Sequence, residues 1–312
     1  MKMSIDVKQK ASAFAVVSAL ILSLAKFSVG LISGSMAVVA SGLDSLLDVF
    51  MSAMNLYAIR KAAEPADEGH PYGHGKAESI AGTLQAVVII STGGFIIYKA
   101  VAEFLERAPI NYSALDLVVM GLSLIFSFVI STVLRRIGQR TGSNALKADA
   151  LHYTSDLYSN SAAIAAIIFS YATGVLFFDS GFAVATGIII IVSAIRIMKE
   201  GISGLMDASV PEAVEQEIQR IIEEMPFPYA GYHKLRTRLS GNRKYIDFHL
   251  LACRKLRIDE AHSLAHEIEN RIKDKVAPAD TVIHVEPCEH TCDLNETTCW
   301  IVKTRSQKQP RA

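Results

Sequence analysis

Charged residues are scarce in this chain, and the charge of the two signs cancels. Asp, Glu, Lys and Arg make up 20% of the 312 residues, and 31 basic residues balance 31 acidic ones. A nucleic-acid-binding surface needs a basic excess, so this balance disfavours a nucleic-acid partner. The sequence also lacks the nucleotide-binding motif GxxxxGKS or GxxxxGKT, which disfavours an ATP-driven pump.

What remains is apolar: 51% of the residues are hydrophobic and the mean hydropathy is +0.30. Soluble domains are rarely so apolar, so the composition predicts a membrane protein. No cleavable signal peptide is evident, because the first apolar stretch is followed by several more. The apolar runs fill the first two thirds of the sequence, whereas most of the charge lies in the last third. This contrast predicts a membrane domain over residues 1–207 followed by a second domain.

Six runs are long enough to cross a bilayer, which takes about 20 mostly apolar residues in a helix. We expect these spans at Ala13 to Ile32, Met36 to Ile59, Ser79 to Ala102, Leu115 to Leu134, Ala145 to Tyr171 and Leu176 to Ile197. Lysine and arginine gather before the first run, between the second and third, between the fourth and fifth, and after the sixth. By the positive-inside rule, both termini are predicted to be cytoplasmic.

The charged third predicts a small α+β domain at residues 208–290. A helix from Pro211 to Glu224, strands at His233 to Leu239 and Tyr245 to Leu251, a helix from Asp259 to Val276 and a strand at Thr281 to Val285 give the order α-β-β-α-β. That order is typical of a ferredoxin-like or metallochaperone-like domain. Residues 291–312 are polar and are predicted to be disordered.

Two of the predicted spans carry paired metal-ligand residues. Asp44 and Asp48 lie four residues apart in the second span, and His152 and Asp156 lie four residues apart in the fifth, so each pair shares a helix face. A buried charge costs about 2.5–3.5 kcal/mol even on the mild insertion scale, so the carboxylates need compensation. Nitrogen and oxygen ligands from all four residues suit Zn²⁺, and also Fe²⁺, Cd²⁺, Co²⁺ or Mn²⁺. The alternative is that the four residues form hydrogen bonds that only hold the helices together.

Three stretches resemble the cation diffusion facilitator family: SGSMAVVASGLDSLLD from Ser33, PADEGHPYGHGKAES from Pro65 and HYTSD from His152. The resemblance extends from the first span to about Pro287 and is greatest to the bacterial ferrous-iron and zinc efflux type. It implies that Asp44, Asp48, His152 and Asp156 form the transport site. It further implies a homodimer in the inner membrane that exchanges metal ions for protons.

Further ligand-rich segments lie outside the spans. The loop after the second span holds Asp67, Glu68, His70 and His74, a plausible peripheral metal site or simply a turn shaped by HPYGH. The resemblance assigns Asp67, His70 and His74 to a second site at the membrane boundary. Lys76 and Asp207, otherwise two solvated charges, are assigned by the resemblance to an interlock between the helices of the dimer.

The C-terminal domain is rich in histidine. His284 and Glu286 are two residues apart on a predicted strand and therefore face the same side. Lone strand histidines are usually ordinary polar positions, but the resemblance implies a binuclear site at the domain's dimer interface, built from His233, His249, His262, His284 and Glu286. Relatives carry Asp at the last of these positions, so the longer Glu alters the expected geometry. No role is assigned to His266 or His290.

Four cysteines are present, at Cys253, Cys288, Cys292 and Cys299. Cytosolic thiols stay reduced, so a disulfide framework is not expected. Cys288, Cys292 and Cys299 with His290 match no standard zinc spacing, and free thiols are the favoured interpretation.

The residues and the resemblance together predict an antiporter that exports Zn²⁺, Fe²⁺ or Cd²⁺, with the metal as substrate and regulatory ion, and with no organic cofactor. A protonatable imidazole that must be neutral to bind metal gives competition between metal and proton. Two alternatives stay open: a metal sensor or scaffold that does not transport, and a membrane metalloenzyme. The latter is disfavoured because HYTSD is not HExxH and four protein ligands leave no vacancy for a substrate.

Overall fold

The computed structural model describes residues 2–33, 36–106, 114–173, 177–225 and 229–289. The chain divides into two compact units, Met1–Met206 and Asp207–Ala312. The predicted disordered tail at residues 291–312 lies outside the described residues, as do His290, Cys292 and Cys299.

Six long helices make up the described part of the first unit. They are α1 (Lys2–Ser33), α2 (Met36–Ala62), α3 (Ala77–Glu106), α4 (Ala114–Thr141), α5 (Asn144–Thr173) and α6 (Phe177–Leu205). The shortest, α2, has 27 residues. At 1.5 Å per residue it extends about 40 Å, which exceeds a hydrocarbon core of about 30 Å.

Four helices among the described residues are both long and apolar enough to cross a membrane. These segments are Ile5–Ile32, Ala77–Ala102, Val118–Thr141 and Ser180–Leu205, which belong to α1, α3, α4 and α6. Helices α2 and α5 have 27 and 30 residues and are not among these four. Their sequences hold the paired ligands together with basic residues near one end. The chain is therefore an integral membrane protein, and its predicted site lies on α2 and α5.

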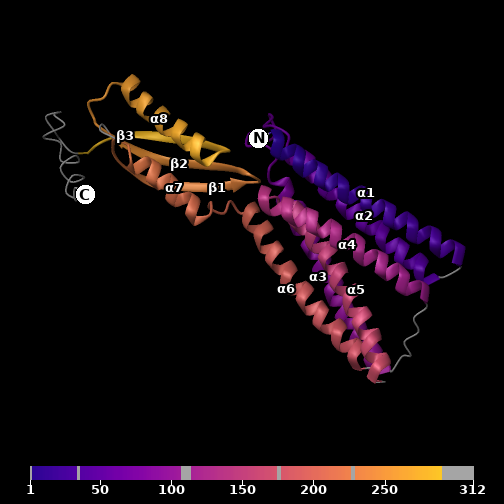
Figure 1. Ribbon diagram of the computed structural model, residues 1–312. Coiled ribbons are helices and arrows are strands. Elements are labelled where there is room, and N and C mark those ends of the chain that lie inside the picture. Colours follow the sequence, from indigo (N-terminus) through magenta and orange to yellow (C-terminus); the bar gives the residue numbers. More distant parts are fainter. Residues whose placement is uncertain (1, 34–35, 107–113, 174–176, 226–228, 290–312) are drawn as a thin grey trace, which may run out of the picture. The chain divides into compact units, whose positions relative to one another are not determined.

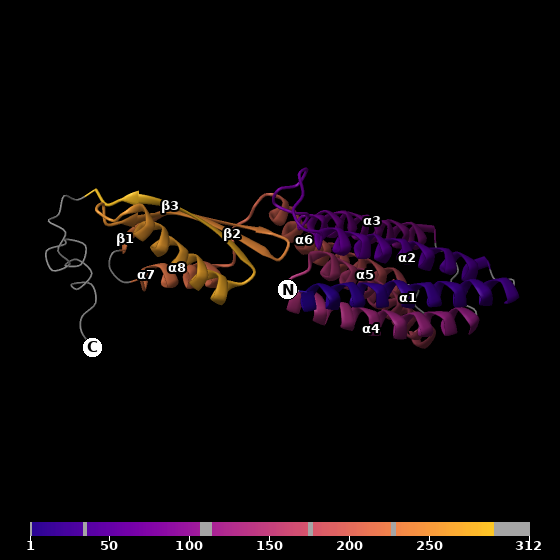
Figure 2. The same ribbon diagram turned by 90° about the horizontal axis from the view of Figure 1, so that it is seen from above.

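The helices pack as pairs, with α1 on α2, α3 on α6 and α4 on α5 (Figure 1). Helix α1 also lies along α4, as the view from above shows (Figure 2). Small residues allow the close approach of α3 and α6. A Cβ atom built on Gly187 would lie 2.6 Å from Ile97 Cγ1 and 3.0 Å from the carbonyl oxygen of Gly93.

The second unit contains α7 (Glu212–Glu223), β1 (Tyr229–Ser240), β2 (Arg243–Ala252), α8 (Ile258–Val276) and β3 (Ala279–Pro287). The order α-β-β-α-β agrees with the prediction, and each predicted strand is longer in the structure. The sheet order is β1-β2-β3. Strand β2 runs antiparallel to β1 and parallel to β3, and α8 provides the crossover that a parallel pair requires.

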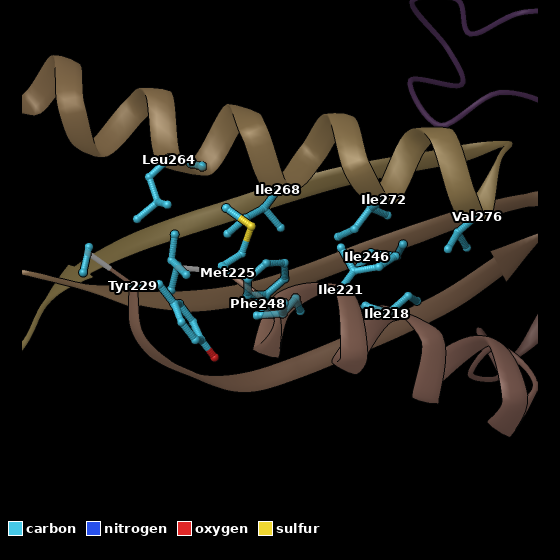
Figure 3. Packing of buried hydrophobic residues seen from close by; sticks show 14 of the residues in the cluster. Ile218, Ile221, Met225, Tyr229, Ile246, Phe248, Leu264, Ile268, Ile272 and Val276 are labelled. Carbon is cyan, nitrogen blue, oxygen red and sulfur yellow. The ribbon is translucent and has the colours of Figure 1, made fainter. Parts of the chain in front are cut away.

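The core of this unit lies on one face of the sheet. Apolar residues recur every three or four positions in both helices and every second position in β2, which matches the helical and strand periods. Figure 3 shows the helix side chains meeting those of the strand. The fully buried members are Ile218, Ile221, Ile222, Ile246, Phe248, Leu250, Ile268 and Ile272.

Because side chains alternate along a strand, the residues between these core positions point to the opposite face. On β2 this set includes Asp247 and His249, and on β3 it includes His284 and Glu286, whereas Ile283 and Val285 pack against the core. The helix-free face of the sheet is thus where the strand histidines gather.

Candidate metal-binding sites

Helices α2 and α5 bring three predicted ligands together. Single ligand atoms of Asp48, His152 and Asp156 all lie within 4.8 Å of one another. His152 Nε2 is 2.9 Å from Asp48 Oδ1, a hydrogen bond between the two helices. Each of the three side chains is half-buried. Two carboxylates and an imidazole in this geometry can surround a divalent cation.

Asp44, the fourth predicted ligand, does not belong to this trio. It lies one turn before Asp48 on α2 and is exposed. Spacing of four residues puts both aspartates on one face of the helix, but it does not fix how far each side chain lies from α5.

A cation that the sequence prediction overlooked lies beside the site. Lys26 on α1 is only 9% exposed, and its Nζ donates a hydrogen bond to Ser45 Oγ at 2.8 Å. Ser45 sits between the two aspartates of α2, and the ammonium group interacts electrostatically with Asp44, Asp48 and Asp156. A charged residue inside an otherwise apolar run is the signal that identifies such a position, since lone charges there are costly.

A second overlooked residue is Asp149, three positions before His152. It is fully buried and binds Ser52 Oγ at 3.0 Å and Gln85 Nε2 at 3.3 Å. Its neighbour Tyr153 is also buried, and the ring of Tyr153 meets the His152 ring edge to face with centroids 5.4 Å apart.

The loop between α2 and α3 forms a second cluster, of Asp67, His70 and His74. Asp67 Oδ1 accepts a hydrogen bond from the His70 backbone N–H at 2.7 Å, and this bond holds the pKa of Asp67 below its ordinary value. His74 Nε2 lies 3.4 Å from Asp67 Oδ2. The His74 ring is buried, and neither of its nitrogens has a hydrogen-bond partner. Buried ring nitrogens without a hydrogen-bond partner suit a metal ligand. The contact between Asp67 and His70 also shapes the turn.

The third cluster lies on the helix-free face of the C-terminal sheet. Strand register places His233 opposite His249 and His249 opposite His284. Glu286 accepts hydrogen bonds from His249 Nδ1 at 2.6 Å and from His233 Nε2 at 2.8 Å. These hydrogen bonds, of which the one from His249 contributes most, hold the pKa of Glu286 below its ordinary value. His284 Nε2 is 3.7 Å from the same carboxylate.

His262 lies apart from that cluster. It is an exposed residue near the start of α8 and lines a pocket with Cys253 and Glu286. His266, one turn later, stacks with it at a centroid distance of 6.1 Å. The predicted elements already put His262 on a helix and the other histidines on strands, but they gave no distance between that helix and the strands.

The proposed interlock residues each have a partner within their own unit. Lys76 Nζ donates to the carbonyl oxygen of Leu205 at 3.1 Å, and Asp207 accepts from Arg238 at 3.2 Å. Cys253 and Cys288 are free thiols.

These clusters lie within two domains that known proteins share. Residues 12–206 match a family described as the cation efflux transmembrane domain, and residues 210–288 match the cation efflux protein cytoplasmic domain. The chain belongs to the cation diffusion facilitator family. It is 34% identical to the cation-efflux pump FieF of Salmonella arizonae over 279 residues, which cover 89% of this chain and 92% of the relative. Its identity to the FieF of Salmonella newport is 35% over 256 residues, 82% of this chain and 85% of the relative.

The boundaries of the two cation diffusion facilitator domains separate the three clusters. The helix trio and the loop cluster fall in the transmembrane domain, and the sheet cluster falls in the cytoplasmic domain. Each cluster therefore lies in a part of the chain that matches a family of cation-efflux proteins.

Proposed function

We propose that this protein exports divalent metal cations from the cytoplasm across the inner membrane in exchange for protons. Asp44, Asp48, His152 and Asp156 form the transport site, with Zn²⁺, Fe²⁺ or Cd²⁺ as substrate. One observation carries the proposal: helices α2 and α5 of a cation-efflux domain bring Asp48, His152 and Asp156 to within metal-binding distance.

The hydrogen bond between His152 and Asp48 supports the exchange of metal for proton. A hydrogen bond between imidazole nitrogen and carboxylate oxygen at 2.9 Å contains a proton, and both residues belong to the trio. An imidazole nitrogen binds metal only when that nitrogen carries no proton. Metal and proton therefore compete for one position, which supplies antiport without nucleotide hydrolysis.

The proposal includes alternating access and six membrane spans, with both termini in the cytoplasm. Helices α2 and α5 are long enough to span, and they can do so despite their polarity if the other four helices shield them from lipid. The half-burial of the trio's side chains and the full burial of the polar network next to it support that arrangement. The cytoplasmic domain is proposed to adopt a ferredoxin-like or metallochaperone-like fold and to hold the homodimer together.

Two auxiliary sites complete the proposal. Asp67, His70 and His74 bind an ion at the membrane boundary and deliver it to the transport site. His233, His249, His284 and Glu286, with His262 from α8, bind regulatory metal, and binding at this site draws two cytoplasmic domains together. Lys76 and Asp207 are proposed to interlock the dimer.

The test is reconstitution in liposomes that enclose a zinc-sensitive dye, with an imposed pH gradient. We expect zinc flux that depends on the direction of the gradient and is lost in Asp48→Ala. Asp259→Ala is the matched control, because it removes an exposed carboxylate from the cytoplasmic domain. Zinc binding without flux in the wild type would instead favour a sensor or scaffold. Flux that Asp48→Ala leaves intact would contradict the assignment of the site.

A further inference from the structure

Lys26 is a charged residue inside a helix segment that is otherwise apolar. It belongs to the part of α1, Ile5–Ile32, that is long and apolar enough to cross a membrane, and it is only 9% exposed. A lysine in a spanning helix commonly extends its side chain toward the membrane surface. The Lys26 ammonium group instead donates to Ser45 Oγ of α2 at 2.8 Å, so it stays inside the helix bundle.

Close packing of α1 on α2 holds Lys26 at this place. A Cβ atom built on Gly42 of α2 would lie 3.0 Å from Phe27 Cδ2, and the Gly42 carbonyl oxygen accepts a hydrogen bond from Ser23 Oγ at 3.1 Å. Glycine and serine allow helix backbones in a membrane to approach closely. Because these contacts lie on both sides of Lys26 along α1, they keep this part of the helix against α2, within reach of Ser45.

The ammonium group lies near the carboxylates of the proposed transport site. Ser45 is located between Asp44 and Asp48 on α2. The ammonium group interacts electrostatically with both of these carboxylates and with Asp156 of α5. Its hydrogen-bond partner Ser45 is a neutral hydroxyl, so this bond does not offset the ammonium charge. A positive charge inside a membrane domain needs opposite charges around it, and the three aspartates supply them.

The charges of a metal-loaded site explain why a lysine suits this position. Carboxylates bind metal in their ionised form and His152 binds it as a neutral imidazole, so the three aspartates contribute three negative charges. One divalent cation offsets two of these charges. The third would remain inside the membrane domain, where an uncompensated charge is costly. The ammonium group of Lys26 offsets it.

We propose that Lys26 is the resident counter-cation of the transport site, an inference that rests on the proposed function. Its ammonium group repels the incoming divalent cation, which lowers the affinity of the site and speeds release of the ion. It also leaves the loaded site without net charge, which lowers the cost of exposing that site to one side of the membrane and then to the other. In this role Lys26 is a positioning residue, because it acts through the aspartates and does not bind the ion.

The alternative is that Lys26 only ties α1 to α2 through its hydrogen bond with Ser45. Such a tie predicts that a variant without the hydrogen bond loosens the helix packing and weakens zinc binding. A counter-cation predicts a change of the opposite sign, because removal of a nearby positive charge strengthens the binding of a cation. The sign of the change in zinc affinity therefore separates the two roles.

Zinc binding to the purified full-length protein tests the charge. Isothermal titration at about pH 8 limits competition from protons, and the transport site is the binding component that Asp48→Ala removes. We expect Lys26→Gln to tighten this component by about tenfold, since one positive charge near three carboxylates is lost. Lys26→Arg keeps the charge and should stay within about threefold of the wild type. Ser23→Ala is the matched control, because it removes a buried hydrogen bond between α1 and α2 without a change of charge.

Zinc affinity in Lys26→Gln that equals or falls below that of the wild type would overturn the proposal. If Lys26→Gln does not fold, Lys26→Met takes its place, because its unbranched apolar side chain needs no hydrogen-bond partner. Ser45→Ala gives an independent check, since it breaks the tie between the helices but keeps the ammonium group and should not tighten zinc binding. Equal tightening in Ser45→Ala and Lys26→Gln would also overturn the proposal, because the charge would then not be the cause.

Zinc flux in liposomes gives a second readout and separates this proposal from the function on which it rests. Tighter binding and a net charge on the loaded site should lower both the KM and the maximal flux of Lys26→Gln, each by about fivefold or more. Tighter zinc binding in Lys26→Gln, in a protein whose wild type shows no flux, would support the counter-cation and contradict transport. Wild-type flux that Lys26→Gln leaves unchanged, together with unchanged affinity, would support transport and contradict the counter-cation.

Discussion

The membrane unit and the C-terminal unit bury different kinds of side chain. Buried residues of the membrane unit include many serines and several larger polar groups, among them Lys8, Lys26, Asn55, Glu78, Gln85 and Asp149. In the described part of the C-terminal unit, Ser240 is the one buried polar residue, and the core consists mainly of Ile, Leu and Phe.

The solvent around each unit explains this difference. Apolar side chains gain nothing by leaving lipid for a protein interior, so the interior of the membrane unit is free to hold polar groups paired with one another. Water around the C-terminal unit drives apolar groups inward and leaves polar groups on the surface. The metal-binding clusters follow the same division, with the trio half-buried between helices and the His233 cluster on an open sheet face.

Removing a ligand from the buried trio should have the largest effect. Asp48→Ala removes one of two carboxylates in the trio and leaves Asp156 to face His152 alone. We expect zinc flux in liposomes to fall by about a hundredfold or more, since even second-shell partners of metal ligands contribute 10–100-fold. If the flux of this variant stayed within a factor of a few of the wild type, the trio would matter no more for transport than the exposed His233 cluster.

A cavity in the apolar core should affect the C-terminal unit alone. Phe248 on β2 is 1% exposed and belongs to the core cluster that also includes residues of α7 and α8. Phe248→Ala should lower the free energy of unfolding of this unit by about 3–5 kcal/mol. Hydrogen exchange of the full-length protein would measure this, with the amides of α3 and α6 as the internal control. Equal loss of protection in those helices would mean that the two units do not unfold separately.

Small residues, in contrast, should determine packing in the membrane unit. Gly187→Ala places a Cβ atom 2.6 Å from Ile97, and we expect overpacking of about 1–3 kcal/mol. Gly94→Ala on α3 is the matched control, because a Cβ atom there meets nothing within 4 Å. Thermal stability in detergent should fall for the first variant and stay level or rise for the second. Equal stability of the two would contradict the close packing of α3 and α6.

The exposed sheet cluster should give the smallest effect on transport. Glu286→Gln keeps the shape of the side chain but removes the charge that His233 and His249 share. We expect zinc affinity of this cluster to weaken by about tenfold, while flux at saturating zinc changes by less than about threefold. Isothermal titration beside the flux assay measures both. A loss of flux as large as that of Asp48→Ala would make the sheet cluster part of the transport path.

Much of the fold was predictable because its periodicities are strong. Long apolar runs identified the helices of the membrane unit, and alternation identified β1, β2 and β3. Helices α2 and α5 were also predicted, and their polar residues form the trio and part of the Asp149 network.

The sites were predictable only in part, because spacing gives a shared face but not a distance between elements. The pairs on α2 and α5 were found from their four-residue spacing, yet Asp44 is exposed and lies outside the trio. Lys26 and Asp149 were overlooked because neither belongs to a pair of metal-ligand residues four positions apart, and what each touches comes from other helices. His262 was predicted on a helix and the other histidines on strands, but how close they lie to one another was not predictable.

The sequence by itself determined the surroundings of each part and the faces on which the ligands lie, because these follow from composition and from the periods of helix and strand. Only the tertiary structure decided which ligands meet and which partners share each buried hydrogen bond, because those groups come from helices far apart in the chain.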